Sequence, residues 1–353
     1  MALAVRLCET LKQVDFMSVS GASHLTRIYR TEGRRSHATE GKRSHITEGK
    51  RSHTTDNIRS PVNSSQYCLD LVRRSDYENF MATLLLPQQA RATAIAVRAF
   101  NVEVAQIQDL TSEILMAKMR LQFWRETLDD IYNDKAPKQP VAMALQKAVQ
   151  AQKLSKRWLR SLIDSREDHL GKKQFPTLEA VEDYGEKSNS VLYYLVLQGL
   201  GVENVHADHA ASHLGKAEGL VRLVRGVPHH ATRKNVFLPR DVMIKHGVSQ
   251  ENIIRGNQDQ KVKDVIFDTA SLAHQHLEHA RSFIQDVPKE ARVALLPAAA
   301  VSDYLTALQN THFDVFHSSL QIILQKAWKH WLGSTKHLLY GLHRREGFVD
   351  PDH

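Results

Sequence analysis

The chain has 353 residues, of which 42% are hydrophobic and 24% charged, and this composition is ordinary for a soluble globular protein. The formal net charge is +8, but residues 1–60 hold 11 basic and 6 acidic residues, so only +3 belongs to the rest of the chain. This uneven spread argues against a nucleic-acid-binding protein. Cys8 and Cys68 are too few for a disulfide framework or a cysteine zinc site, and no apolar run reaches the ~18 residues of a membrane span.

The first 60 residues have the composition of a targeting segment followed by a disordered repeat. The first 30 contain four basic and only two acidic residues among serines and threonines, which is typical of a mitochondrial presequence; an unstructured cytosolic tail is the alternative. Residues 31–54 are three tandem octapeptides, TEGRRSHA, TEGKRSHI and TEGKRSHT. They have no apolar periodicity, so we expect disorder, and we interpret their regularly spaced histidines as repeat expansion rather than a metal site.

From Gln66 to Leu320 the pattern is helical, and no stretch shows sustained strand alternation, so the predicted fold class is all-α. In residues 111–133 a predicted buried stripe recurs every three or four positions, and residues 94–107 are apolar on nearly every side. The stripe consists of Ile114, Ala117, Leu121, Trp124, Leu128 and Ile131. The other predicted helices span 66–81, 140–151, 155–170, 177–199, 207–225, 259–284 and 291–309, with Pro176, Gly199, Gly201, Pro228 and Pro239 as boundaries.

Residues 321–353 form a third region, rich in basic and aromatic residues. The segment has the pattern of an amphipathic helix through about Leu342. A docked terminal helix or a disordered tail is the favoured interpretation, and a helix lying on a membrane surface is the alternative. The predicted organisation is therefore 1–60, 61–320 and 321–353.

Residues 219–239, GLVRLVRGVPHHATRKNVFLP, contain the most distinctive pattern in the chain. They resemble the second aspartate-rich region of the squalene/phytoene synthases, a pattern close to NxxRDxxED followed by a basic run and Phe-Leu-Pro. Arg225 fits the pattern, but Gly226 and His230 stand where that family has its two metal-binding aspartates. Glycine offers no ligand, and Mg²⁺ prefers hard carboxylate oxygens to imidazole nitrogen.

The first aspartate-rich region of the same family, FxxxxDDxxD, is best matched by residues 100–109, FNVEVAQIQD. In this register Ala105 and Gln106 replace the paired aspartates, and only Asp109 remains. The chain is thus similar to the family over about residues 66–320. The longest segments that carry the resemblance, such as 119–132 and 234–255, are most similar to a divergent mitochondrial branch of the family that serves respiratory complex I assembly.

The resemblance implies a helical isoprenoid-synthase fold and a role in building complex I without prenyl transfer. It implies a mitochondrial protein, peripheral to the matrix side of the inner membrane, whose partners are complex I subunits or other assembly factors. No metal, cofactor or catalytic residue is expected, and an isoprenoid or other lipid is a candidate ligand. The rival functions are an active transferase with a shifted metal site built from Glu103, Asp109 and the acids of 126–134, and a non-catalytic prenyl-lipid or quinone-binding protein.

Three further groups of polar residues have two interpretations each. Basic residues around the second motif form either an anion site or ordinary surface charge; they are Arg222, Arg225, Arg233, Lys234 and Arg240. Glu126, Asp129, Asp130 and Asp134 are expected on a solvated helix face, with Arg125 paired to Asp129, rather than at a metal. His206, His209 and His213 are expected to cap or pack rather than to bind zinc.

Overall fold

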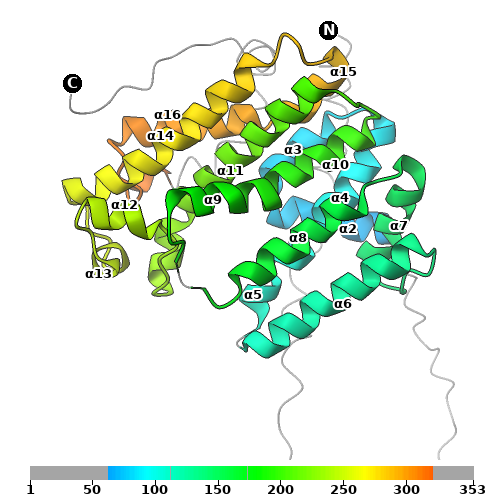
Figure 1. Ribbon diagram of the computed structural model, residues 1–353, viewed down its shortest axis with the longest axis horizontal. Helices are drawn as coiled ribbons and strands as arrows, with labels where there is room; N and C mark the ends of the chain where they lie inside the picture. Colours follow the sequence, from blue (N-terminus) through cyan, green and yellow to red (C-terminus); the bar gives the residue numbers. More distant parts are fainter. Residues whose placement is uncertain (1–62, 112, 173, 321–353) are drawn as a thin grey trace, which may run out of the picture. The chain divides into compact units, whose positions relative to one another are not determined.

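The computed structural model describes residues 63–320, apart from 112 and 173. The expected presequence and repeat (1–60) and the divergent tail (321–353) lie outside these residues. The described part consists of helices with no strand, which confirms the all-α prediction (Figure 1). The helices are α2 (Ser64–Ser75), α3 (Tyr77–Leu84), α4 (Gln88–Ala105), α5 (Ile107–Leu110), α6 (Ile114–Tyr132), α7 (Pro140–Gln152), α8 (Lys156–His169), α9 (Leu178–Gly185), α10 (Val191–Gly199), α11 (Val205–Thr232), α12 (Arg240–Lys245), α13 (Gln250–Ile254), α14 (Gln260–Ser282), α15 (Lys289–Arg292) and α16 (Ala298–Asn310).

Helix α11 is the longest, and α14 runs alongside it (Figure 1). The side chain of Asn204 accepts a hydrogen bond from the Ala207 amide at 2.9 Å, which satisfies one of the free N–H groups at the start of α11. The prediction that Pro228 ends this helix is wrong, because α11 continues to Thr232. A proline inside a helix costs about 3 kcal/mol, and burial of Val227 and Ala231 on either side offsets that cost.

A π-helical segment, Glu186–Ser190, joins α9 to α10 and packs tightly on α11. The contact depends on Gly215, since a Cβ atom there would lie only 2.3 Å from the backbone nitrogen of Ser190. The sequence predicts one helix over 177–199; the structure shows a helical path whose hydrogen bonding is locally rearranged to i→i+5. This rearrangement brings the segment against the middle of α11.

The predicted helix 66–81 is broken at Asp76, whose φ of −142° and ψ of 55° are not helical. The break separates α2 from α3 and turns the Asp76 carboxylate toward Arg98 of α4 and Arg222 of α11. We attribute the break to these ion pairs, which a continuous helix pattern does not reveal.

The predicted stripe of α6 is buried from Ala117 onward, which confirms Trp124 as a core residue, 4% exposed. The Trp124 ring packs edge-on against Phe100 of α4 with 5.3 Å between centroids. Ile114 is a correction, because it is 53% exposed. It occupies the first position of α6, where the side chain reaches past the core toward the loop at Gly171.

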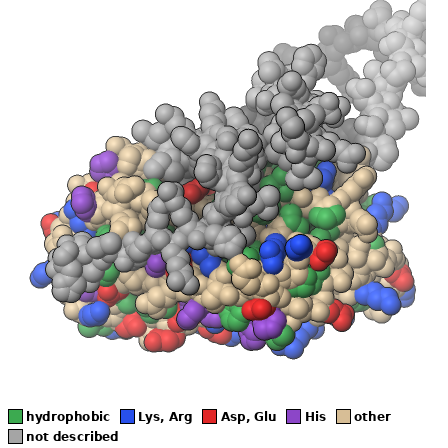
Figure 2. All heavy atoms as spheres, turned by 90° about the horizontal axis from the view of Figure 1, so that it is seen from above, with side chains coloured by type: hydrophobic (Ala, Val, Ile, Leu, Met, Phe, Trp, Pro, Cys, Tyr) green, Lys and Arg blue, Asp and Glu red, His purple; other side chains and the backbone are tan. Residues whose placement is uncertain are grey.

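On the face drawn in Figure 2, Lys and Arg side chains alternate with Asp, Glu and His over the described surface. Within residues 63–320, no single helix has the length and apolar character to cross a membrane, although the bent pair Lys289–Leu295 and Ala298–Asn310 passes the same test together.

Candidate functional site

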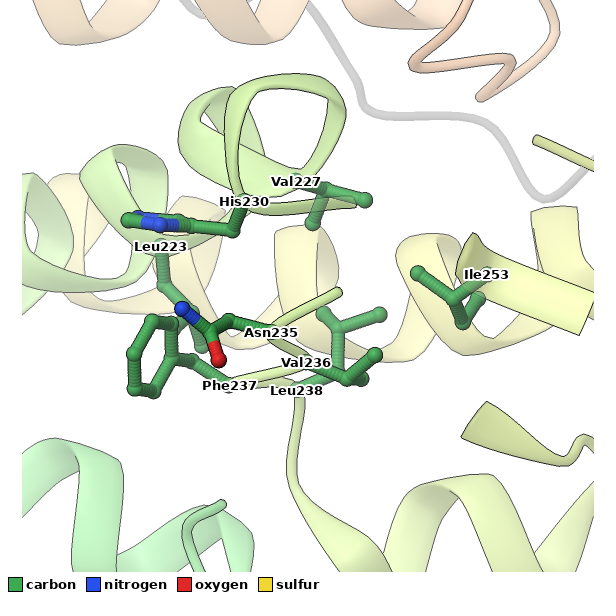
Figure 3. Close-up of a pocket in the computed structure, with 8 residues that line it drawn as sticks. All are labelled: Leu223, Val227, His230, Asn235, Val236, Phe237, Leu238 and Ile253. Carbon is green, nitrogen blue, oxygen red and sulfur yellow. The ribbon is translucent and has the colours of Figure 1, made fainter. Parts of the chain in front are cut away.

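The two positions of the second motif lie near the end of α11. The imidazole of His230 lies over Gly226, so that a Cβ atom on this glycine would be 3.0 Å from the His230 Cδ2 atom. The same ring packs edge-on against Phe237, with 4.7 Å between the ring centroids; both side chains are drawn in Figure 3. Burial, with the neighbouring His229, lowers the pKa of His230. A neutral imidazole therefore fills the space beside the missing side chain.

Asp109, at the end of α5, reaches the second motif. Its Oδ1 atom lies 3.6 Å from the Nη1 atom of Arg233, and both side chains are more than half exposed. The other two positions of the first motif do not share this contact: Ala105 is exposed at the end of α4, and the Gln106 side chain donates to the Ser75 hydroxyl at 3.1 Å. The structure thus brings the two motif regions together, but through a carboxylate and an arginine.

A small pocket lies between the end of α11 and the segment that follows it (Figure 3). Its empty volume is about 190 Å³, including the part open to solvent. Sites for drug-sized ligands usually exceed about 300 Å³, so the volume of this pocket is small for a long isoprenoid chain. Its lining is Leu223, Val227, His230, Asn235, Val236, Phe237, Leu238 and Ile253.

Beside these motif positions lies a buried charge cluster, formed by Asp76, Arg98, Glu218 and Arg222. The Arg222 guanidinium contacts Glu218 at 2.7 Å and Asp76 at 3.0 Å, and Arg98 contacts the other oxygen of Asp76 at 3.2 Å. The Asp76 and Glu218 side chains are each 9% exposed. The cluster therefore has two carboxylates and two guanidinium groups, which balance in charge within the core.

Neutral donors complete the coordination of Glu218. Asn79 of α3 donates to one carboxylate oxygen at 2.8 Å, and the Tyr193 hydroxyl of α10 donates to the other at 2.7 Å. Burial alone would raise the pKa of Glu218, but Arg222 and Arg98 hold this pKa at about 2. The carboxylate is therefore ionised at every physiological pH, with its oxygens already engaged.

The buried charge cluster was not predicted from the sequence, although the sequence contains a signal of it. Arg98 interrupts the apolar run AIAVRAF in the middle of a predicted buried helix, and Glu218 lies on the buried face of α11. A charged residue on an apolar face needs a partner, since burying an unpaired charge is costly. The sequence does not show which residues pair, because Asp76 lies in a break that the periodicity conceals.

The five basic residues of the expected anion site do not act as one set in the structure. Arg222 belongs to the buried charge cluster, the Nη1 atom of Arg225 donates to both carboxylate oxygens of Glu78 at 2.9 and 2.8 Å, and Arg233 contacts Asp109. Lys234 and Arg240 are exposed. Arg222 and Arg225 are thus engaged within the protein, and anion binding by the set stays a prediction.

The three histidines of α11 face α14, as the packing interpretation expects. His209 stacks on Phe283 with centroids 5.5 Å apart, and His206 lies against the same ring at 6.3 Å. His213 Nδ1 lies 2.8 Å from His276 Nδ1. Within the described ranges, no group of three or more His, Cys, Asp or Glu side chains is arranged to hold a metal ion.

The acidic residues of α6 are exposed, as predicted, but the predicted pairing of Arg125 with Asp129 is wrong. Arg125 instead reaches across to α8, where it binds Asp164 at 2.6 Å and also Glu167. Asp129 pairs with Lys156 at 2.8 Å. Contacts between helices override the i, i+4 spacing here because α8 presents two carboxylates to one guanidinium.

Comparison with known proteins places this geometry in a family. A family model described as squalene/phytoene synthase matches residues 72–326. A Bos taurus protein named NADH dehydrogenase (ubiquinone) complex I, assembly factor 6 is 50% identical over 258 residues, covering 73% of this chain and 78% of the relative. Its Drosophila melanogaster homolog is 40% identical over 262 residues, 72% of this chain and 78% of that protein. The crystal structure of a squalene synthase from Alicyclobacillus acidocaldarius superposes on this chain with a TM-score of 0.64 at 21% sequence identity. The match covers 71% of this chain and 95% of the squalene synthase chain.

Proposed function

The chain belongs to the squalene/phytoene synthase family, and from that premise we propose that it is an assembly factor for mitochondrial complex I (NADH:ubiquinone oxidoreductase) and not a prenyl-transferring enzyme. Relatives that are 50% and 40% identical over most of the chain carry the assembly-factor name and support this role. In this proposal the protein works on the matrix side of the inner membrane, peripherally, with complex I subunits or other assembly factors as partners. Residues 1–60 supply the targeting segment.

One observation carries the non-enzymatic part of the proposal: a single arginine beside the positions of the second metal motif already occupies the buried carboxylates of this region. The family pattern has an asparagine three residues before its arginine, and here that position is Arg222. Its positive charge contacts Asp76 and Glu218, the buried carboxylates of this region. Mg²⁺ needs several free carboxylate or carbonyl oxygens, and these carboxylates already bind Arg98 and Arg222. The residues present do not fit Mg²⁺, and we derive no reaction step through it.

The rival transferase draws no support from its own proposed ligands. Glu103 is only partly exposed, accepts a hydrogen bond from Tyr67 at 3.2 Å, and has a pKa raised by burial. Asp109 contacts Arg233, Glu126 accepts from Gln122, Asp129 pairs with Lys156 and Asp134 accepts from Gln150. These carboxylates therefore have separate protein partners and do not converge on one point.

A prenyl-transfer assay tests the non-enzymatic claim. Incubated with farnesyl or geranylgeranyl diphosphate and Mg²⁺, the purified protein should return the substrate unchanged. Steady formation of a head-to-head condensation product would overturn the claim. A catalytically active member of the family, assayed under the same conditions, is the positive control.

A further inference from the structure

Large exposed apolar side chains gather on one short stretch of the molecule. Among the described residues, six of the ten exposed large hydrophobic side chains lie between Leu110 and Phe123, on α5 and the first half of α6. Isolated exposed apolar residues are ordinary in soluble proteins, whereas a contiguous group marks a contact surface. This stretch is therefore the strongest candidate for an interaction site outside the region of the two motifs.

Four of these residues form what we call the α6 ridge: Leu115, Met116, Met119 and Phe123, which are 67%, 46%, 60% and 47% exposed. Leu115, Met119 and Phe123 are spaced by four, so they follow one line along the helix. The buried stripe of the same helix runs along the opposite side. α6 is thus apolar on two faces, and only one of them is covered by the described core.

The charges around the α6 ridge indicate what covers it. Lys118 and Arg120 are exposed and flank the ridge on its two sides. Long basic side chains beside exposed Leu, Met and Phe are typical of helices that lie at a lipid–water interface, where the apolar face enters the acyl boundary and the basic groups meet anionic headgroups. Glu126 and Asp130 are exposed acids on the same side of α6, three and seven residues beyond Phe123, and they stay in water when the first half of the helix docks.

Neighbouring loops add to the positive charge at this end of α6. Lys172 is exposed and follows Gly171, whose backbone lies against the Ile114 side chain. Lys234 is also exposed and adjoins Arg233, the residue that contacts Asp109 at the end of α5. Glu113 is an exposed acid at the start of α6, so the local excess of basic residues is modest and apolar contact carries the affinity.

We propose that the α6 ridge is the surface by which this protein lies on an anionic membrane leaflet. The proposal rests on the proposed function in one respect, since it gives the peripheral inner-membrane placement a defined face. It commits to lipid because the ridge is a convex helix face with basic flanks, whereas a partner protein would have to supply a groove of matching shape.

Vesicle co-sedimentation of the full chain tests the proposal. The probes are vesicles of phosphatidylcholine alone and of phosphatidylcholine mixed with phosphatidylglycerol. The wild-type protein should bind the anionic vesicles more tightly, and the triple variant Leu115→Ser, Met119→Ser, Phe123→Ser should lower its partition coefficient about ten-fold or more, because the apolar contact is lost. The substituted side chains are exposed, so circular dichroism should show an unchanged helical fold.

A matched variant controls for loss of apolar surface in general. Met143, Val205 and Ile244 are also exposed but lie on three other helices, and their triple replacement by Ser should leave vesicle binding at the wild-type level. The charge-reversed pair Lys118→Glu, Arg120→Glu should weaken the preference for anionic vesicles relative to the wild type. All variants keep residues 1–60, so the basic segment contributes equally to each.

Equal partition of the ridge variant and the wild type would overturn the proposal. The same conclusion would follow if the ridge variant changed only the oligomeric state in sedimentation, because the ridge would then be a contact between copies. The assay contains no complex I. Its failure would leave the assembly role standing, and normal complex I in cells lacking the protein would leave the lipid-binding face standing.

Discussion

Replacing Arg222 with methionine removes the central cation of the buried charge cluster while keeping an unbranched side chain of similar length. Glu218 and Asp76 would then share Arg98 alone. The pKa of Glu218 is about 2 in the folded protein, well below the 4.5 of an ordinary glutamate. Each pKa unit corresponds to about 1.4 kcal/mol, so the surroundings favour the charged form by a net of about 3 kcal/mol after the cost of burial.

That value is divided between two arginines and two neutral donors, and the Arg222 side chain is itself 33% exposed. Removing one partner of a buried pair costs about 3–5 kcal/mol, and solvent access at Arg222 reduces this figure. We therefore expect Arg222→Met to lower the free energy of unfolding by about 2–3 kcal/mol at neutral pH. Urea denaturation followed by circular dichroism measures the change.

Arg225→Met is the matched control, one turn farther along α11. Its partner Glu78 is 37% exposed, and exposed pairs contribute about 0–1 kcal/mol. The double variant Arg222→Met, Glu218→Gln should recover part of the loss, since it removes the unpaired carboxylate. Equal, small effects of the two arginine variants would refute the reasoning, because the cluster would then contribute no more than a surface pair.

Three other changes test the packing and its pH dependence. Trp124→Ala removes a ring that packs on Phe100 in the core and should destabilise the domain by about 3–5 kcal/mol; a change in the urea midpoint equivalent to under ~1 kcal/mol would show that the stripe is not core. Gly215→Ala places a methyl group 2.3 Å from the Ser190 backbone. It should lower the melting temperature, with a loss of about 1–3 kcal/mol or more in the free energy of unfolding. An unchanged melting temperature would contradict the close approach of the two segments. Burial and two neighbouring histidines lower the pKa of His213 from 6.5 to about 4. Between these pH values the unfolded chain binds a proton at His213 that the folded protein does not. The free energy of unfolding should therefore fall as the pH drops from 6.5 toward 4. His213→Gln should flatten that part of the stability–pH curve, and an equally steep curve in the variant would assign the dependence to other groups.

Periodicity predicted the long helices well because their buried faces alternate regularly with solvent. Trp124 and the buried part of its stripe follow directly from such spacing. The errors fall where a long-range contact decides the local conformation. Asp76 breaks a helix to reach Arg98 and Arg222, and Arg125 leaves its i+4 neighbour for α8.

At the candidate site, the sequence shows which residues stand at the family's metal positions. It does not show which charged groups occupy the space around them in place of the aspartates and the metal. The motif identifies the positions of Gly226 and His230. Only the structure of α11 shows that the His230 ring lies over Gly226. The sequence predicts Arg222 as a surface or anion-binding residue. Its partners are Asp76 in the α2–α3 break and Glu218 on α11 itself, so its role emerged only from the approach of that break to α11.

Restoration of complex I in cells lacking the protein tests the central claim most directly. Native gels should show less assembled complex I in such cells, with isoprenoid pools unchanged, and re-expression of the wild type should restore the assembled complex. Asp109→Ala should restore it equally well, because an assembly role needs the folded domain and not the remaining acid of the first motif. Leu121→Pro should fail, since proline in a helix interior costs about 3 kcal/mol or more. Recovery that required Asp109, in a variant shown to be folded, would contradict the account and revive an enzymatic role.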